Sequence, residues 1–219
     1  MKMPVQHHLD EAMLMAYAAG TLPEAFNLII ATHVSLCDAC RAAVESCDAV
    51  GGALLENQPD VAMDAGSLDR LMTRLDALPA PEAATPATPA PAEGTFPAPL
   101  RDYVGGDLEA VRWRPVGMGV KQAVLPTSDG ATARLLFIPA GAAIPDHSHA
   151  GTELTLVLKG AFLDGEDRFA RGDIEVADDS VTHTPIADID SDCICLAVTD
   201  APLRFQGWIP RIVQRFVGI

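Results

Sequence analysis

The feature that most restricts the fold of this chain is a proline-rich segment near its middle. Seven prolines fall within residues 79–99, PAPEAATPATPAPAEGTFPAP. Proline has no backbone donor and does not fit inside a helix or a central strand, so we predict an extended linker here. Helical periodicity precedes this segment and short β-like runs follow it. The sequence therefore predicts an α+β protein of two domains, helical over 1–78 and β-rich over 100–219.

Charge indicates which class of molecule the protein binds, and hydropathy indicates whether the chain has a membrane segment. The 219 residues include 15 Lys+Arg against 30 Asp+Glu, a formal charge of −15, and 49% of them are hydrophobic. This acidic balance argues against direct binding to nucleic acid or to an anionic membrane and favours a basic protein partner. We find neither an apolar run of about 18 residues nor the apolar core of a signal peptide. We therefore expect a cytoplasmic protein without a membrane segment.

Three or four helices are predicted before the linker. They cover residues 10–19, 23–33, 35–55 and 67–78, with Ser35 and Ser67 as candidate caps of the last two. The last helix carries an apolar stripe at helical spacing, formed by Leu68, Leu71, Met72, Leu75 and Leu78. The residues alone favour packing of this stripe on its own domain, and docking onto a partner is the alternative.

A first candidate metal site lies in the helical half. His33, Cys37 and Cys40 follow the spacing H-x3-C-x2-C, and His7 and His8 lie upstream. Two thiolates at the start of a helix and two imidazoles would make a closed, structural Zn²⁺ site. A buried cysteine pair beside a chance histidine is the alternative interpretation.

These residues resemble the zinc-binding anti-sigma domain of bacteria. The resemblance covers residues 5–50 and includes HHLDEAMLMAYAAGTLPEA and HVSLCDACR. It implies His8 as the fourth ligand, with His7 as the second choice. It also implies a domain that binds an extracytoplasmic-function sigma factor and keeps it from RNA polymerase.

A second candidate metal site lies in the β-rich half. The spacing G-x5-H-x-H-x3-E-x6-G over residues 141–160 matches the first cupin motif. His147 and His149 would point to one face of a strand, Glu153 would begin the next strand, and His183 is the remaining candidate ligand. We therefore expect a cupin-type antiparallel barrel or jelly roll that holds one divalent ion. The ligand set accepts Zn²⁺, Fe²⁺, Mn²⁺ or Ni²⁺, and we favour Zn²⁺.

Two further cysteines lie late in the chain. Cys193 and Cys195 fall on one face of a predicted strand. A place beside the strand that carries His183 is one option for it, and a sulfur would then approach the metal. Packing as small core residues is the favoured interpretation, and an oxidisable pair is the alternative.

An anti-sigma domain joined to a cupin resembles the ChrR family. That resemblance implies a non-enzymatic regulator that restrains a group IV sigma factor and releases it under oxidative stress, chiefly singlet oxygen, with the cupin as sensor. The alternative is a metal-dependent cupin dioxygenase or isomerase with an accessory zinc domain. The second cupin motif is only partly present, which argues against catalysis.

Overall fold

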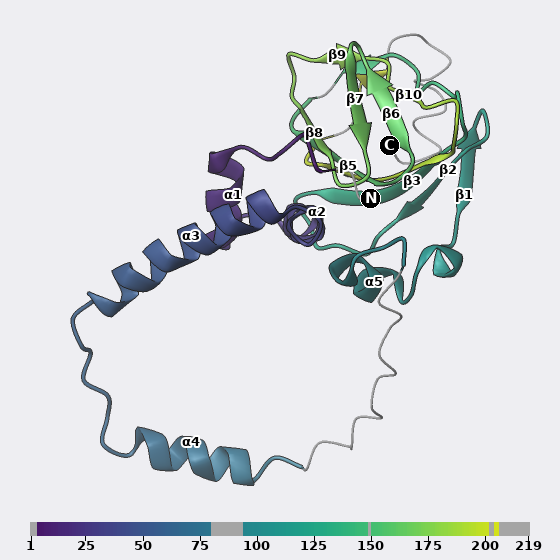
Figure 1. Ribbon diagram of the computed structural model, residues 1–219. Helices are drawn as coiled ribbons and strands as arrows, with labels where there is room; N and C mark the ends of the chain where they lie inside the picture. Colours follow the sequence, from purple (N-terminus) through teal and green to yellow (C-terminus); the bar gives the residue numbers. More distant parts are fainter. Residues whose placement is uncertain (1–3, 80–93, 149, 202–203, 206–219) are drawn as a thin grey trace.

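A computed structural model describes residues 4–79, 94–148, 150–201 and 204–205. Five α-helices lie in this part of the chain (Figure 1): α1 (Glu11–Ala18), α2 (Glu24–Val34), α3 (Asp38–Glu56), α4 (Ser67–Asp76) and α5 (Ala98–Val104). A short 3-10 helix, Leu108–Ala110, follows α5. The four helices predicted from the sequence are confirmed, and α5 is an addition to them. None of the described helices is long and apolar enough to cross a membrane.

Local side-chain chemistry sets where the helices begin. Asp10 caps α1 by accepting a hydrogen bond from the Met13 N–H (2.7 Å). The prediction that Ser35 caps the third helix is wrong, because Ser35 ends α2 and the Cys37 sulfur caps α3 by accepting from the Cys40 N–H. Ser67 is likewise the first residue of α4 and not its cap, which is Gly66.

The β half consists of antiparallel strands, as predicted. One sheet has six strands in the order β1-β2-β3-β11-β5-β8, and two three-stranded sheets have the orders β10-β6-β7 and β12-β4-β9. The strands are β1 (Arg114–Gly117), β2 (Val120–Val124), β3 (Thr132–Ile138), β4 (His147–Ser148), β5 (Glu153–Lys159), β6 (Ala161–Asp164), β7 (Asp167–Ala170), β8 (Ile174–Ala177), β9 (Thr182–His183), β10 (Ile186–Ala187), β11 (Cys193–Thr199) and β12 (Arg204–Phe205).

The large sheet is covered on both faces. Along β5, Leu154, Leu156 and Leu158 belong to the core shared with α2, whereas Val157 belongs to the core inside the barrel. Every residue of β11 is buried, which explains its continuous apolar sequence. Figure 1 shows α2 against one face of the large sheet and the small sheets over the other.

The first three helices are therefore not separate from the β half. Leu14 of α1, Phe26 and Ile29 of α2, and Val44 of α3 lie in one hydrophobic core with the sheet. Most of the predicted linker, residues 80–93, lies outside the described residues. At its C-terminal end the Phe96 side chain is buried in the same core.

Helix α4 is different, because none of its residues is buried against the part of the chain that the structure describes. The five side chains of the predicted stripe are 49–67% exposed: Leu68, Leu71, Met72 and Leu75 of α4, and Leu78 just after it. Packing of this stripe on its own domain, the interpretation favoured from the sequence, is not what these residues show. In Figure 1 the helix lies away from the rest of the protein.

Candidate metal centres

The first cluster forms where the N-terminal segment meets α2 and α3. One ligand atom from each of His8, His33, Cys37 and Cys40 lies within 4.8 Å of all the others. The His8 Nδ1 is 3.2 Å from the Cys37 sulfur and 3.6 Å from the Cys40 sulfur. Tetrahedral zinc with N and S ligands requires edges of about 3.5 Å. These four residues therefore have the spacing that a closed zinc site needs.

The state of His33 supports this reading independently. Its side chain is fully buried, and its Nδ1 donates to the Gly172 carbonyl at 3.0 Å. The Nε2 atom is left buried without a hydrogen-bond partner. Burial lowers the pKa of His33 to about 4, so the ring is neutral near pH 7. A neutral imidazole with an unsatisfied buried lone pair is what a metal ligand offers.

The Cys40 thiol lies in an environment that opposes its ionisation. Burial, and to a smaller extent the neighbouring Cys37, raise the pKa of the Cys40 thiol to about 11. The N-terminus of a helix favours a thiolate, but at Cys40 burial has the larger effect. A bound divalent cation would reverse this balance because it deprotonates a coordinating thiol.

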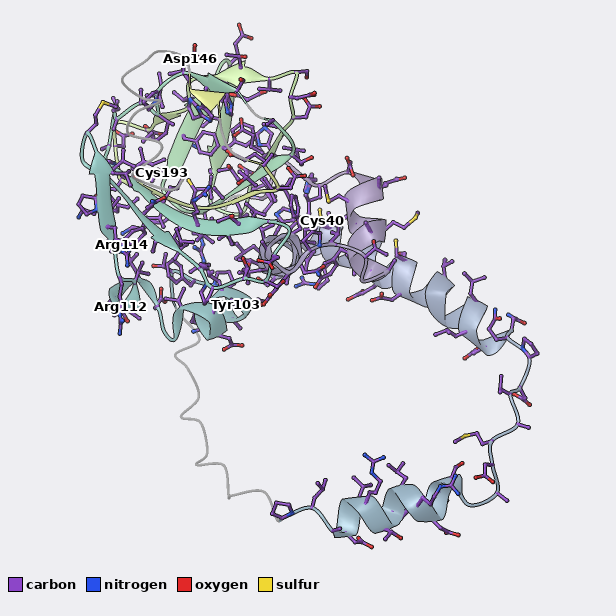
Figure 2. The ribbon with its side chains drawn as sticks, turned by 180° about the vertical axis from the view of Figure 1, so that it is seen from behind. Cys40, Tyr103, Arg112, Arg114, Asp146 and Cys193 are labelled. Atoms are coloured by element: carbon purple, nitrogen blue, oxygen red, sulfur yellow. The ribbon has the colours of Figure 1, made fainter. Side chains whose placement is uncertain are left out.

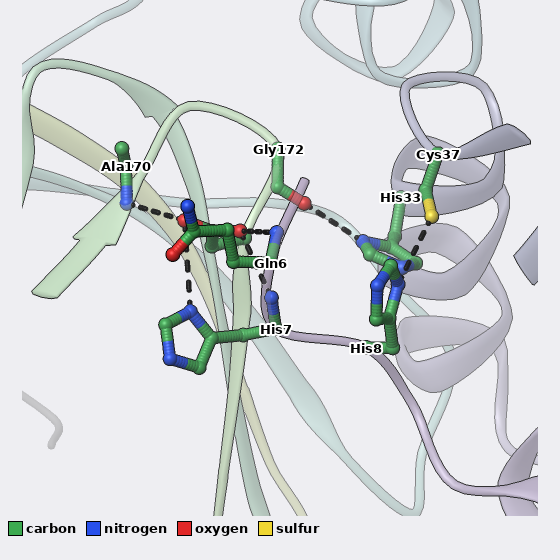
Figure 3. A network of polar contacts seen from close by, with 8 residues as sticks. Gln6, His7, His8, His33, Cys37, Ala170 and Gly172 are labelled. Carbon is green, nitrogen blue, oxygen red and sulfur yellow. Dashed lines mark hydrogen bonds and ion pairs between the residues drawn. The ribbon is translucent and has the colours of Figure 1, made fainter. Parts of the chain in front are cut away.

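His7 lies outside the cluster. Its ring contacts Phe169 at a tilt of 35° with centroids 4.2 Å apart, and its Nδ1 is 3.6 Å from an Asp173 carboxylate oxygen. Figure 3 shows His7 and His8 directed to opposite sides of the N-terminal segment. Of the two histidines that the sequence offers, His8 is the one with a ligand atom in the cluster.

The second cluster lies inside the barrel. Ligand atoms of His147, Glu153 and His183 lie within 4.8 Å of one another, and all three residues are buried. The pairing of β4 with β9 places His147 opposite His183, with ring centroids 4.7 Å apart. The predicted fourth ligand, His149, lies outside the described residues.

Two carboxylates that our sequence reasoning missed hold His183. Its Nδ1 is 2.9 Å from an Asp164 oxygen and 3.5 Å from a Glu175 oxygen. Burial opposes the charged imidazole, but Glu175 and Asp164 raise the pKa of His183 to about 9. A carboxylate on the second nitrogen of a ligating histidine fixes its tautomer and orientation. The only sequence signal for Glu175 was an acid inside the short apolar run IEVA.

Glu153 is buried, unlike an acid on the protein surface. Burial raises its pKa to about 7, although His183 and a hydrogen bond from the Thr155 hydroxyl (3.2 Å) favour the carboxylate. A divalent cation would supply the positive charge that stabilises the buried Glu153 carboxylate. The residues of both clusters thus fit metal ions by their geometry and by their donor chemistry.

The interior beside the second cluster is small. A cavity of about 70 Å³ is lined by His147, Glu153, Glu175, Phe162 and Cys195, among others. Pockets for organic substrates usually have roughly 300–1,000 Å³. This cavity has room for an ion and its water but not for a substrate of ordinary size.

The cysteine pair lines the inner face of β11. The Cys193 and Cys195 sulfurs are 3.4 Å apart, and both side chains are buried. Their strand pairs with β3 and β5, so the option of a place beside the strand of His183 is wrong. Figure 2 shows Cys193 within the β half and Cys40 at the junction with the helices.

Together, the fold and these clusters define a two-part protein, a helical module with a His/Cys cluster packed on a cupin-type barrel with a His/Glu cluster. The family model of the ChrR cupin-like domain matches residues 102–202. The anti-sigma-E factor ChrR of Cereibacter sphaeroides is 56% identical over 217 residues, which cover 99% of this chain and 100% of that protein. The chain therefore belongs to the ChrR family of anti-sigma factors.

One of the solved structures that the chain resembles supports this assignment. A crystal structure of Rhodobacter sphaeroides SigE in complex with the anti-sigma ChrR matches with a TM-score of 0.77 and 54% identity, over 89% of this chain and 99% of that one. An RmlC-like cupin protein from Ralstonia eutropha matches with a TM-score of 0.41 and 24% identity, over 46% and 70% of the two chains. Anti-sigma factors are regulators, so the prediction of a non-enzymatic protein is confirmed by family membership.

Proposed function

We propose that this protein binds and inhibits an extracytoplasmic-function sigma factor of group IV in the cytoplasm. The observation that carries the proposal is the exposed apolar stripe of α4, formed by Leu68, Leu71, Met72, Leu75 and Leu78. An amphipathic helix with its apolar face in water fits the groove of a partner. The C-terminal half of α3 adds the exposed side chains of Val50, Leu54 and Leu55.

Charge supports the same partner. The formal charge of −15 complements a protein whose working surface binds promoter DNA and is therefore basic. Complementary charge speeds encounter, and the apolar stripe then supplies the buried contact. Residues 1–78 would carry inhibition, residues 79–99 would act as the linker, and residues 100–219 would act as the sensor.

Metal ions have separate roles in this proposal. Zn²⁺ held by His8, His33, Cys37 and Cys40 would fix the N-terminal segment to α2 and α3 and would contribute folding free energy. A divalent ion, with Zn²⁺ preferred, would be held by His147, His149, Glu153 and His183. Family membership favours oxidative stress, chiefly singlet oxygen, as the signal read at this ion or at Cys193 and Cys195. No observation favours the enzyme alternative, and the small cavity disfavours it.

The test is capture of a candidate sigma factor by the full-length protein after co-expression. Leu71→Asp with Leu75→Asp should abolish capture and release transcription of a sigma-dependent reporter. Thr73→Asp with Ala77→Asp adds the same charge to the opposite face of α4 and should leave capture intact. Capture that survives the first pair, or that both pairs abolish equally, would contradict the assignment of the stripe.

A further inference from the structure

The turn between β7 and β8 touches the first metal cluster directly. We call residues 170–173 the bridging turn. Its Gly172 carbonyl accepts the hydrogen bond from the His33 Nδ1, as Figure 3 shows. Gly172 has a φ of +95°, and a Cβ there would lie 2.8 Å from the Val5 side chain. The turn and the N-terminal segment are thus in close contact, and the tautomer of His33 depends on the cupin half.

Asp173 ties the same turn to the segment that carries His8. One of its carboxylate oxygens accepts from the backbone N–H groups of Gln6 (2.6 Å) and His7 (3.0 Å). The other oxygen accepts from the Ala170 N–H at 2.8 Å. The Ile174 N–H donates to the His7 carbonyl, so this segment also pairs with the outer edge of β8. Asp173 is buried, so these charge-assisted bonds act in a low dielectric.

The other end of this connection is the second cluster. Glu175 follows Asp173 by two residues in extended backbone, and its carboxylate is 3.5 Å from the His183 Nδ1. Successive residues of a strand rise about 3.3 Å, so the two carboxylates are separated by a short, stiff stretch of chain. Backbone hydrogen bonds from Gly172 and to Asp173 fix this stretch to Val157 of β5.

An aromatic contact runs in parallel. The His7 ring contacts Phe169 at a tilt, and Phe169 stacks on Phe162 with centroids 4.9 Å apart. Phe162 lines the cavity beside His147 and Glu153. A displacement of Phe162 in this cavity would therefore reach His7, the residue before His8, through Phe169.

We propose that the bridging turn and β8 couple the two metal centres, with Asp173 and the Gly172 carbonyl as positioning groups for the zinc ligands His8 and His33. A change in the ligation of His183 alters its contacts with Glu175 and Asp164, and β8 carries the displacement to the bridging turn. The signal then passes through packed protein and does not depend on the segment 79–99. This inference rests on the metal binding proposed above.

The experiment measures the alkylation rate of individual cysteines in full-length, zinc-loaded protein by peptide mass spectrometry. Zinc ligation protects Cys37 and Cys40 from alkylation. The loss of a group that orients a metal ligand weakens metal affinity by about 10–100-fold. Asp173→Asn should therefore speed alkylation of Cys37 and Cys40 about tenfold or more. The matched control is Asp167→Asn, an exposed acid of the same hairpin, which should label like the wild type.

Coupling is tested by a double-mutant cycle. Glu175→Gln should speed labelling of Cys37 and Cys40 severalfold, and the double variant with Asp173→Asn should label no faster than Asp173→Asn alone. Labelling of Cys40 that is unchanged in Asp173→Asn, or effects of the two substitutions that multiply independently, would overturn the proposal.

Two measurements distinguish faster labelling by loss of zinc from faster labelling by unfolding, and a failure of the coupling from a failure of the anti-sigma function. The buried Cys193 and Cys195 report unfolding, because they label only when the barrel opens. If Asp173→Asn exposes them, Gly172→Ala is tested in its place. Its control is Gly165→Ala, where φ is also positive (+58°) but no atom lies within 4 Å of the new Cβ. Sigma capture by the wild type is scored in parallel. Its failure refutes the anti-sigma function, whereas unprotected Cys37 and Cys40 in the wild type refute the coupling.

Discussion

Replacing Ile29 by alanine should destabilise the helical half and the β half together. Ile29 is fully buried on α2, in the same core as Leu156 and Leu196 of the large sheet. Truncation of a buried isoleucine to alanine costs about 2–5 kcal/mol, since a cavity remains. In a protein of this size, about 1 kcal/mol shifts the melting temperature by about 2–4 °C. At about 3 kcal/mol, we expect a loss of about 6–12 °C in one transition.

The assay combines calorimetry with hydrogen exchange followed by mass spectrometry. Peptides of α2 and β11 should lose protection by the same free energy, because opening either element breaks the shared core. Leu71→Ala on the exposed α4 is the control and should change stability by less than about 0.5 kcal/mol. The reasoning is refuted if Ile29→Ala lowers protection in α2 while β11 keeps that of the wild type.

Three further predictions follow from local contacts. Hydrogen bonds from the Tyr103 hydroxyl and from Ser128 lower the pKa of Glu24. The contribution of Glu24 to stability is therefore full above its unfolded pKa and is lost as the pH falls through its lower folded pKa. Glu24→Gln should make the free energy of unfolding in urea depend less on pH in that acidic range. Gly160→Ala should destabilise the protein far more than Gly165→Ala in thermal melts, since only at 160 would the Cβ meet backbone, the Asp192 carbonyl at 2.4 Å, and equal effects would contradict this. Chelation should lower the melting temperature and zinc should restore it, by about 4 kcal/mol of stability for an ion in 1,000-fold excess over its Kd; no shift with EDTA would count against both metal centres.

Much of the helical half could be predicted because its signals are local. Asp10, Gly20 and Pro23 mark helix ends by their own conformational preferences, and α1 and α2 begin and end within two residues of the predicted bounds. The H-x3-C-x2-C spacing likewise picked out three side chains of the first cluster, at the end of α2 and the start of α3. Ser35 misled because a serine is also compatible with the last turn of a helix, and a thiol took the cap that we assigned to it.

What the sequence did not reveal depends on contacts between distant residues. Asp164 and Glu175 become part of the second site only through strand pairing, and no spacing rule connects either of them with His183. The contact of Gly172 with His33 spans 139 residues and depends on how α2 docks on the sheet. The proline-rich segment suggested two separable domains, whereas the buried faces of α2 and β5 form one core.

Helix α4 is part of a connection whose two ends are both anchored in that core. Residues 57–66 join it to α3, and α5 follows on its other side. A protease that cuts once within the exposed residues 57–65 would leave the two pieces associated, because α1–α3 remain packed on the sheet. After the cut, α4 would be attached to the core at one end instead of two. Its conformational entropy without a partner would therefore rise. A nicked molecule would therefore keep its mass and its metal centres under native conditions but would bind any partner of α4 more weakly.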